Sequence, residues 1–152
     1  MPAGLFSPEV DLALRDAGWR PGRRAFAVEF WIDHFEEQEC PPTDAAVDFL
    51  VEFGGLDVLI SGMGITRARE PFDLDPVLCS GNVDRFIDWG QEIGRSLFPI
   101  GVLGPYRQCL GIDEFSEIYL IETQIASFGR MPDAMEALVL GRMPVRLDAD
   151  PS

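Results

Sequence analysis

The chain has 152 residues, of which 47% are hydrophobic and 11% aromatic, so it can bury a sizeable core, and its length favours a single domain. Its 26 acidic and 12 basic side chains give a formal net charge of −14, and every basic side chain is an arginine. This balance argues against binding to DNA, RNA or an anionic membrane and favours basic partners.

The cysteines and the N-terminus bear on the compartment. Cys40, Cys79 and Cys109 are widely spaced and odd in number, which predicts neither a disulfide framework nor a CxxC metal or redox motif. Residues 1–7 lack the basic start and apolar run of a signal peptide, and no apolar stretch approaches the roughly 20 residues that span a bilayer. We therefore expect a cytoplasmic protein in a reducing compartment.

Three helices are predicted in the first third of the chain. Ser7 before Pro8, with Gly18 further on, indicates a helix over about 8–17. A second helix is predicted over 26–39, with an apolar face made of Phe26, Val28, Phe30, Trp31, Ile32 and Phe35. Thr43 or Asp44 can cap a third helix before Gly54 and Gly55, and its apolar positions are Ala46, Phe49, Leu50 and Phe53.

Short strands and a fourth helix follow. Residues 56–60 read as a buried strand and residues 72–74 as a short edge strand. Asn82 can cap a helix whose apolar face continues to Leu97, and Gly90 and Gly94 within it indicate close packing.

The remaining segments indicate an antiparallel meander and a last helix. Apolar runs of three to five residues, separated by Gly, Pro, Asp and Ser, fill the stretch from Phe98 to Phe128. A helix opens at Met131-Pro132-Asp133 and closes at Gly141. The order of elements favours an α+β fold, which we expect as one domain over residues 1–145 with a short tail over 146–152, frayed from Asp148.

The residue types that support catalysis are scarce or unspecific. His34 is the one histidine and lies inside a predicted helix, where a structural or surface role is the better interpretation. The cysteines lack the close ligand pairs of a zinc site, and no phosphate-binding glycine motif occurs. Carboxylates are too abundant to single out an acid–base pair, and Asp73 and Asp75 fit an outward strand face before a turn. We predict no catalytic residue, no metal and no cofactor.

Two acidic groups are candidates for contact with a partner. Four acids follow one another at steps of four, three and one residues, which places them on one stripe of the second predicted helix. They are Glu29, Asp33, Glu36 and Glu37. Like charges at i, i+4 oppose helix formation by about 0.2 to 0.5 kcal/mol per pair, a cost that a basic partner would offset. The second group, around one meander turn, is Asp113, Glu114 and Glu117. A solvated outer face explains either group equally simply.

A family resemblance is carried by short segments in a fixed order. They begin with Ala17-Gly18-Trp19-Arg20-Pro21-Gly22-Arg23 after a short amphipathic helix. The following segments are Phe49-Leu50, Phe53-Gly54-Gly55-Leu56, Phe72 with Asp75-Pro76, Trp89, Gly94, Leu97-Phe98-Pro99-Ile100-Gly101, Ile112-Asp113, Tyr119, Gly129, Glu136-Ala137-Leu138 and Gly141. In this order, over about residues 5–141, the chain resembles the third subfamily of SUKH immunity proteins.

The resemblance implies a curved antiparallel sheet flanked by helices and a role in neutralising a polymorphic toxin made by the same bacterium. Many such toxins are nucleases or nucleic-acid deaminases with basic substrate sites, which an acidic protein can block by imitating phosphate charge. Trp19 and Trp89 would be core anchors, and Arg23 would pair with an acid. Cys109-Leu110-Gly111 is less regular than the family pattern, and Ser116 stands in the turn where that pattern has glycine.

Three functions are therefore compared. The leading hypothesis is an immunity protein that holds its toxin by electrostatic and aromatic contacts, without a cofactor. The second is a general intracellular regulator that binds a host protein, and the third is a small carboxylate-based enzyme. An immunity gene should lie beside the gene of a large secreted toxin, which separates the first hypothesis from the second.

Overall fold

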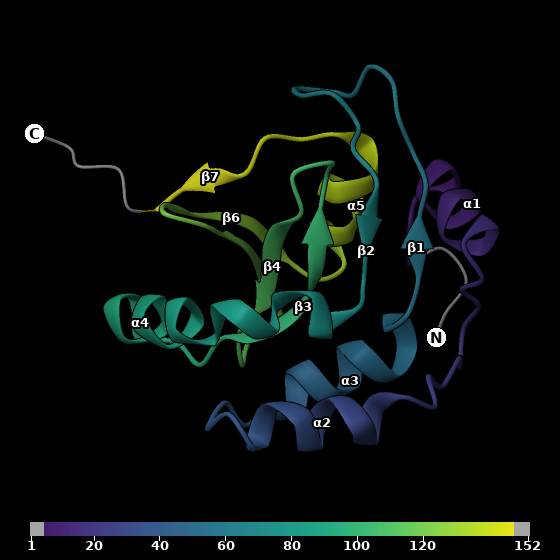
Figure 1. Ribbon diagram of the computed structural model, residues 1–152. Helices are drawn as coiled ribbons and strands as arrows, with labels where there is room; N and C mark the ends of the chain where they lie inside the picture. Colours follow the sequence, from purple (N-terminus) through teal and green to yellow (C-terminus); the bar gives the residue numbers. More distant parts are fainter. Residues whose placement is uncertain (1–4, 148–152) are drawn as a thin grey trace, which may run out of the picture.

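The computed structural model describes residues 5–147 and shows an open antiparallel sheet with helices packed around it (Figure 1). Each strand of the sheet pairs with the next one along the chain, in the order β1 to β7. The strands are β1 (Asp57–Val58), β2 (Phe72–Asp73), β3 (Phe98–Leu103), β4 (Gln108–Ile112), β5 (Glu117–Ile121), β6 (Ile125–Arg130) and β7 (Val145–Arg146). The predicted α+β class and central meander are confirmed.

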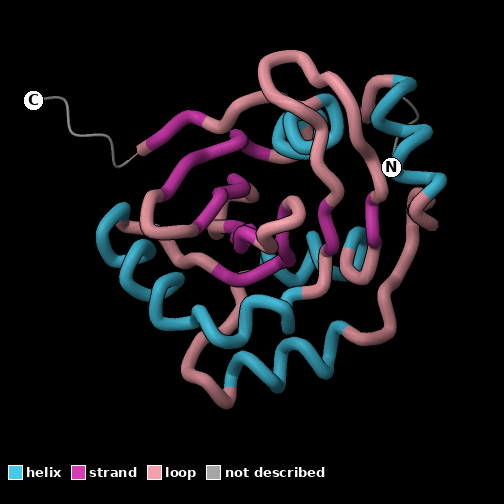
Figure 2. The backbone as a smooth tube through the Cα atoms, turned by 45° about the horizontal axis from the view of Figure 1, so that its top comes forward, coloured by secondary structure: helices cyan, strands magenta, loops and turns pink. Residues whose placement is uncertain are grey.

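Helices surround the strands in Figure 2. They are α1 (Pro8–Asp16), α2 (Val28–Glu36), α3 (Asp44–Phe53), the 3₁₀ helix η1 (Pro76–Asn82), α4 (Val83–Ile93) and α5 (Asp133–Leu140). One sheet face packs on η1 and α4 through a small apolar cluster that includes Phe86, Tyr119 and Ile121. The larger cluster packs α1, α3 and α5 on the other face, while α2 lies against α3 and η1. The sheet is thus covered on both sides along most of its length.

The first, third and last helices follow their sequence signals closely. Pro8 opens α1, and the Thr43 hydroxyl caps α3 by accepting a hydrogen bond from the Ala46 N–H at 3.1 Å. Gly141 ends α5 in the left-handed conformation, with φ at +74°. These helices begin and end where local backbone chemistry places them.

The second helix is shorter than predicted and its apolar face is narrower. It begins at Val28, and only Val28, Trp31 and Phe35 along it are buried. Phe26, before the helix, is fully exposed, and Phe30 is 61% exposed. Residues at i, i+3 and i+7 share one helix face, whereas Phe30 lies on the opposite side of α2. The placement of Phe30 on the apolar face that packs on the core was therefore wrong.

The strand predictions near residues 56 and 72 need correction. The first strand is only Asp57–Val58, and it is the sheet edge, with Asp57 and Leu59 exposed on either side of buried Val58. The second strand, predicted to be an edge, lies between β1 and β3. A short apolar run has the same pattern in an edge strand and in an inner one, so only the pairing distinguishes them.

The entry into α4 also differs from the prediction. Asn82 makes no capping hydrogen bond, because the unpredicted η1 runs directly into α4. The predicted close packing is seen at Gly90, where an added Cβ would lie 2.7 Å from the Arg95 carbonyl oxygen. At Gly94 an added Cβ would meet nothing within 4 Å, so the prediction of close packing was wrong there. Gly94 instead ends the helix at φ +70°, before Leu97.

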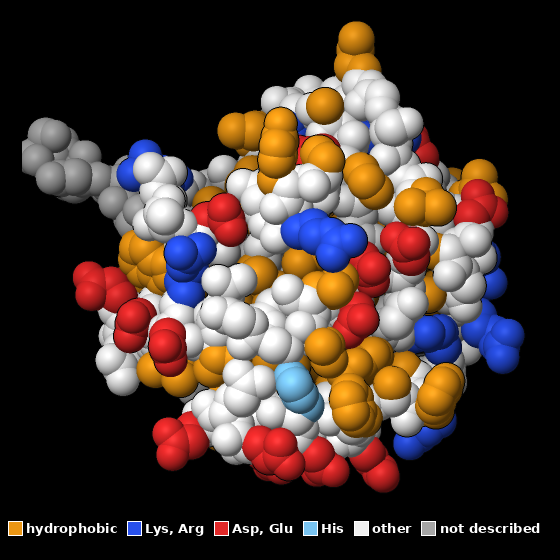
Figure 3. Space-filling view, in the orientation of Figure 1, with side chains coloured by type: hydrophobic (Ala, Val, Ile, Leu, Met, Phe, Trp, Pro, Cys, Tyr) orange, Lys and Arg blue, Asp and Glu red, His pale blue; other side chains and the backbone are white. Residues whose placement is uncertain are grey.

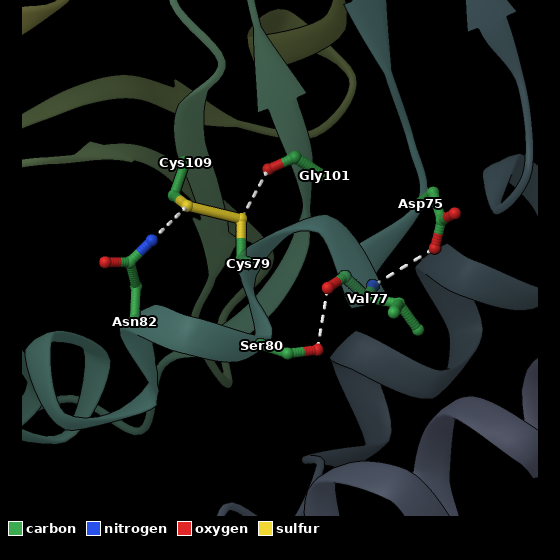
Figure 4. The surroundings of a disulfide bond; sticks show 7 residues. All are labelled: Asp75, Val77, Cys79, Ser80, Asn82, Gly101 and Cys109. Atoms are coloured by element: carbon green, nitrogen blue, oxygen red, sulfur yellow. Dashed lines mark hydrogen bonds between the residues drawn. A yellow bond between two sulfur atoms is a disulfide. The ribbon is translucent and has the colours of Figure 1, made fainter.

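A disulfide joins Cys79 of η1 to Cys109 of β4, which corrects the expectation that no disulfide would form (Figure 4). The two Cα atoms are 6.0 Å apart although 30 residues separate them in the chain. The bond is buried: Cys79 Sγ lies 3.1 Å from the Gly101 carbonyl oxygen, and the Asn82 side-chain amide donates to Cys109 Sγ at 3.4 Å. Cys40 is a free, buried thiol.

The C-terminal end of the described chain adds one unpredicted strand. β7 pairs with β6, with Ala126 opposite Arg146 and Ser127 opposite Val145. The frayed tail predicted from Asp148 lies outside the described residues. Between residues 5 and 147, no helix is long and apolar enough to cross a bilayer.

Candidate partner-binding surface

The four acids predicted to form a stripe on α2 all lie on the solvent side of that helix. Glu29, Asp33, Glu36 and Glu37 are exposed, and Figure 3 shows acidic side chains along the α2 edge of the molecule. Burial of Val28, Trp31 and Phe35 against the core fixes this orientation, because the helix period turns the intervening positions outward. None of the four acids makes an ion pair with any residue from 5 to 147.

The same surface carries an aromatic side chain that the sequence pattern assigned to the core. Phe30 lies between Glu29 and Trp31 in sequence and stacks on the ring of His34, one turn further on, with ring centroids 6.0 Å apart. An exposed phenylalanine among unpaired acids offers a partner both apolar area and charge. We define the α2 face by Glu29, Phe30, Asp33, Glu36 and Glu37.

The α2 face belongs to a long stretch of the sequence that has no positively charged side chain. No lysine or arginine occurs between Arg24 and Arg67. The acids in this interval are Glu29, Asp33, Glu36, Glu37, Glu39, Asp44, Asp48, Glu52 and Asp57. The interval therefore has a formal net charge of −9, compared with −14 for the whole chain, so the segment from α2 to β1 is strongly acidic.

The second predicted group, around the β4–β5 turn, divides into a buried and a partly exposed part. Asp113 has no exposed surface. One of its oxygens accepts hydrogen bonds from the N–H groups of Phe115 (2.8 Å) and Glu117 (3.0 Å), and the other from the Tyr119 hydroxyl (2.7 Å). Arg95 Nη1 lies 3.5 Å from the second oxygen. Asp113 is therefore a structural carboxylate that closes the turn, and burial removes it from any partner-contacting surface.

Glu114 and Glu117 are half-buried and already have internal partners. Glu114 accepts a hydrogen bond from the Ser96 N–H at 3.0 Å, and Glu117 accepts one from the Ser127 hydroxyl at 2.5 Å. Ser116, in the position where the family pattern has glycine, adopts φ +67° and so keeps the left-handed turn. The turn borders α3, because Ser116 lines a small pocket with Asp48. No hydrogen bond or ion pair within residues 5–147 joins this turn to the α2 acids.

Burial of two titratable groups predicts a loss of stability at alkaline pH. Burial, then the hydrogen bond to Asp113, raise the pKa of Tyr119 far above its usual range, and burial raises the pKa of the Cys40 thiol to about 11. Above the unfolded pKa values, near 9 for Cys and 10 for Tyr, the unfolded chain loses protons that the native chain keeps. In urea titrations the free energy of unfolding should therefore fall by about 1.4 kcal/mol per pH unit between pH 9 and 11 because of Cys40, and by a similar slope above pH 10 because of Tyr119.

Two variants show which group causes the loss of stability at alkaline pH. Cys40→Ala should flatten the decline between pH 9 and 11, and Tyr119→Phe should flatten it above pH 10 while lowering stability at neutral pH. Slopes identical to that of the wild type in both variants would contradict the assignment.

The side chains whose chemistry could support catalysis or metal binding have structural roles or lie apart from one another. His34 Nε2 lies 2.8 Å from Ser80 Oγ and 3.1 Å from Gln38 Nε2, so the ring links α2 to η1. No cluster of three or more His, Cys, Asp or Glu side chains in the described part of the chain is arranged to hold a metal ion. The lone histidine thus has a packing role in the fold.

The residues that carry the family resemblance at the end of α3 form one polar junction. Arg23 donates hydrogen bonds from Nη1 to the carbonyl oxygens of Glu52 (2.9 Å) and Gly54 (2.7 Å), so it caps the helix C-terminus instead of pairing with an acid. Trp19 is buried and donates a hydrogen bond to the Glu52 carboxylate at 3.0 Å. Outside this junction, Trp89 on α4 is half-buried and donates a hydrogen bond to the Glu122 carbonyl oxygen. These contacts fix the backbone beneath the surface.

One known protein family matches most of the chain. A family model described as SUKH-3 immunity protein matches residues 6–141. No curated protein and no solved structure matches the chain. The matched span covers all five α-helices and the strands β1 to β6, including the capped end of α3 and the Asp113 turn. The chain belongs to the SUKH-3 immunity protein family.

Proposed function

We propose that this chain binds and neutralises a cognate polymorphic toxin in the cytoplasm of the bacterium that makes both proteins. The toxin would carry a nuclease or nucleic-acid deaminase domain with a basic active-site surface. The protein would act as a stoichiometric inhibitor, without catalysis, cofactor, nucleic acid or membrane. Family membership supports toxin immunity in general, and the α2 face supports the chemistry of the contact.

The α2 face is the observation that carries this proposal. Three of its carboxylates lie on α2 and the fourth, Glu37, directly follows the helix. All four are exposed and without internal ion pairs, so a basic surface could approach them without breaking existing contacts. Opposite net charges steer association and raise its rate at low salt. Phe30 supplies the apolar contact that slows dissociation once the charges have aligned the partners, because buried aromatic groups dominate binding energy.

Co-expression tests the function. The C-terminal domain of the toxin encoded beside this gene would be produced in a bacterium with and without this protein, with growth and co-purification as readouts. We expect growth only in the presence of this protein, together with a stable complex. Loss of growth in both strains, with no complex, would contradict the proposal and favour the regulator hypothesis, which an unbiased pull-down would then address.

Neutralising the stripe should slow binding without affecting folding. The variant Glu29→Gln, Asp33→Asn, Glu36→Gln, Glu37→Gln removes four charges that make no internal ion pair. We expect the association rate with the toxin domain to fall on the order of tenfold at low salt, and its salt dependence to flatten. Stopped-flow kinetics at several salt concentrations measure both effects.

A control of equal charge change separates local from global electrostatics. Four exposed acids on α1 and α4 serve this purpose, in the variant Asp16→Asn, Asp84→Asn, Asp88→Asn, Glu92→Gln. It should slow association much less than the stripe variant does. Equal slowing by both variants would mean that net charge, and not the α2 face, steers the toxin.

A further inference from the structure

One face of the sheet loses its helical cover near the β1 edge. On this face, five residues lie directly opposite one another on neighbouring strands. From β5 to the β1 edge they are Ile121, Cys109, Val102, Asp73 and Asp57. Ile121, Cys109 and Val102 are buried in the apolar cluster with η1 and α4. Beyond them Asp73 is only half-buried and Asp57 is exposed. The cover therefore ends over β2, and the last two positions of the face are open to a partner.

A groove of about 240 Å³ lies at this place. Asp57 and Asp73 line it from the two strands, Leu59 from the loop after β1 and Leu78 from η1. Arg107, in the turn between β3 and β4, lines it as well. Leu59 is 79% exposed and Leu78 also reaches the surface. The groove thus combines two carboxylates and one guanidinium group with two aliphatic side chains, and its excess of negative charge suits a long side chain with a positively charged end.

The two carboxylates of the groove are only partly compensated, because Arg107 also lines it and the groove keeps a net charge of −1. Asp57 and Asp73 are directly opposite in the antiparallel pair, a position where like charges destabilise a sheet. Neither carboxylate makes a hydrogen bond or ion pair with another residue between 5 and 147. Burial, followed by repulsion from Asp57 and Asp75, raises the pKa of Asp73, and Arg107 only partly opposes this. Asp75 is occupied, because it accepts a hydrogen bond from the Val77 N–H at 3.1 Å.

We propose that this groove receives an arginine side chain of the toxin, with Asp57 and Asp73 binding the guanidinium group and Leu59 and Leu78 packing on its aliphatic stem. Arginine fits better than lysine, because its planar fork donates to two carboxylates at once. The inference rests on the proposed function and adds a second contact to the α2 face.

The groove and the α2 face are linked through η1. Leu78 lines the groove, and two residues later Ser80 contacts His34, whose ring stacks on Phe30 of the α2 face. Figure 3 shows acidic and apolar side chains, with a basic side chain among them, on the side of the molecule that carries η1, β1 and β2. One basic partner could therefore contact both surfaces.

The test is the double variant Asp57→Asn, Asp73→Asn against the inactive toxin C-terminal domain encoded beside this gene. We expect Kd to increase about tenfold or more, because a paired cation loses both acceptor charges. We expect the melting temperature to stay or rise, because repulsion between the two strands is removed. A residue with only a structural role would change stability and affinity in the same direction. The control is Asp84→Asn, Asp88→Asn, which removes two exposed charges from α4.

Each outcome is decisive. A wild-type complex whose Kd the double variant leaves unchanged overturns the arginine groove and leaves the proposed function standing. Equal weakening by the α4 control also overturns the groove, because the effect would then be one of net charge. Absence of a wild-type complex overturns the proposed function and this inference together.

Discussion

Replacing both Cys79 and Cys109 with alanine is expected to lower the free energy of unfolding by about 3 to 4 kcal/mol. The disulfide closes a loop of 30 residues between η1 and β4, and it restricts the unfolded chain more than the native one. For a domain of this size the melting temperature should fall by roughly 10 °C, measured by thermal unfolding followed by circular dichroism.

A reductant distinguishes the disulfide from simple loss of side-chain volume. Reduction should destabilise the wild type and a Cys40→Ala variant alike, because Cys40 takes no part in the bond. The double alanine variant should not respond to reductant. If wild type and double variant unfold at the same temperature with and without reductant, the bond does not stabilise the fold.

Asp113→Ala is expected to destabilise the protein by about 3 to 5 kcal/mol. The change leaves the buried Tyr119 hydroxyl and the N–H groups of Phe115 and Glu117 without an acceptor, and it removes the negative partner of Arg95. Asp113→Asn keeps one acceptor oxygen, so its cost should be smaller. Urea unfolding at pH 7 measures the difference, and Asp84→Ala on the exposed face of α4 should change stability by less than about 0.5 kcal/mol.

The same variants separate a structural from a partner-contacting role. Because Asp113 is buried, folded Asp113→Asn protein should bind the toxin domain with unchanged affinity. Weaker binding at unchanged stability would return Asp113 to the contact surface. A cost for Asp113→Ala no larger than that of Asp84→Ala would show that the turn does not need the carboxylate.

Sequence reasoning was most accurate where a local rule decides the structure. The ends of α1, α3 and α5 follow from Pro8, Thr43 and Gly141, and the meander follows from short apolar runs between turn residues. It failed where two outcomes have the same local pattern. Phe30 has the apolar character of a core residue, and Asp113 the charge of a surface residue, yet each has the opposite environment.

The candidate site divides in the same way. The α2 stripe could be predicted because helix periodicity alone aligns Glu29, Asp33 and Glu37. The groove at Asp57 and Asp73 could not, because it depends on which strands pair and on where η1 stops covering them. The Cys79–Cys109 disulfide likewise needs the approach of η1 to β4, which the spacing of the cysteines does not reveal.

By itself, the sequence determined the α+β class, the acidic character, the α2 stripe and the resemblance to an immunity family. These depend on composition, on periodicity and on short motifs, all of which are local properties of the chain. Only the tertiary structure decided that Asp113 is buried, that Phe30 is exposed, that two cysteines meet and that two aspartates share an open groove. Burial and proximity depend on contacts between residues far apart in sequence, such as those of η1 and α4 with the sheet.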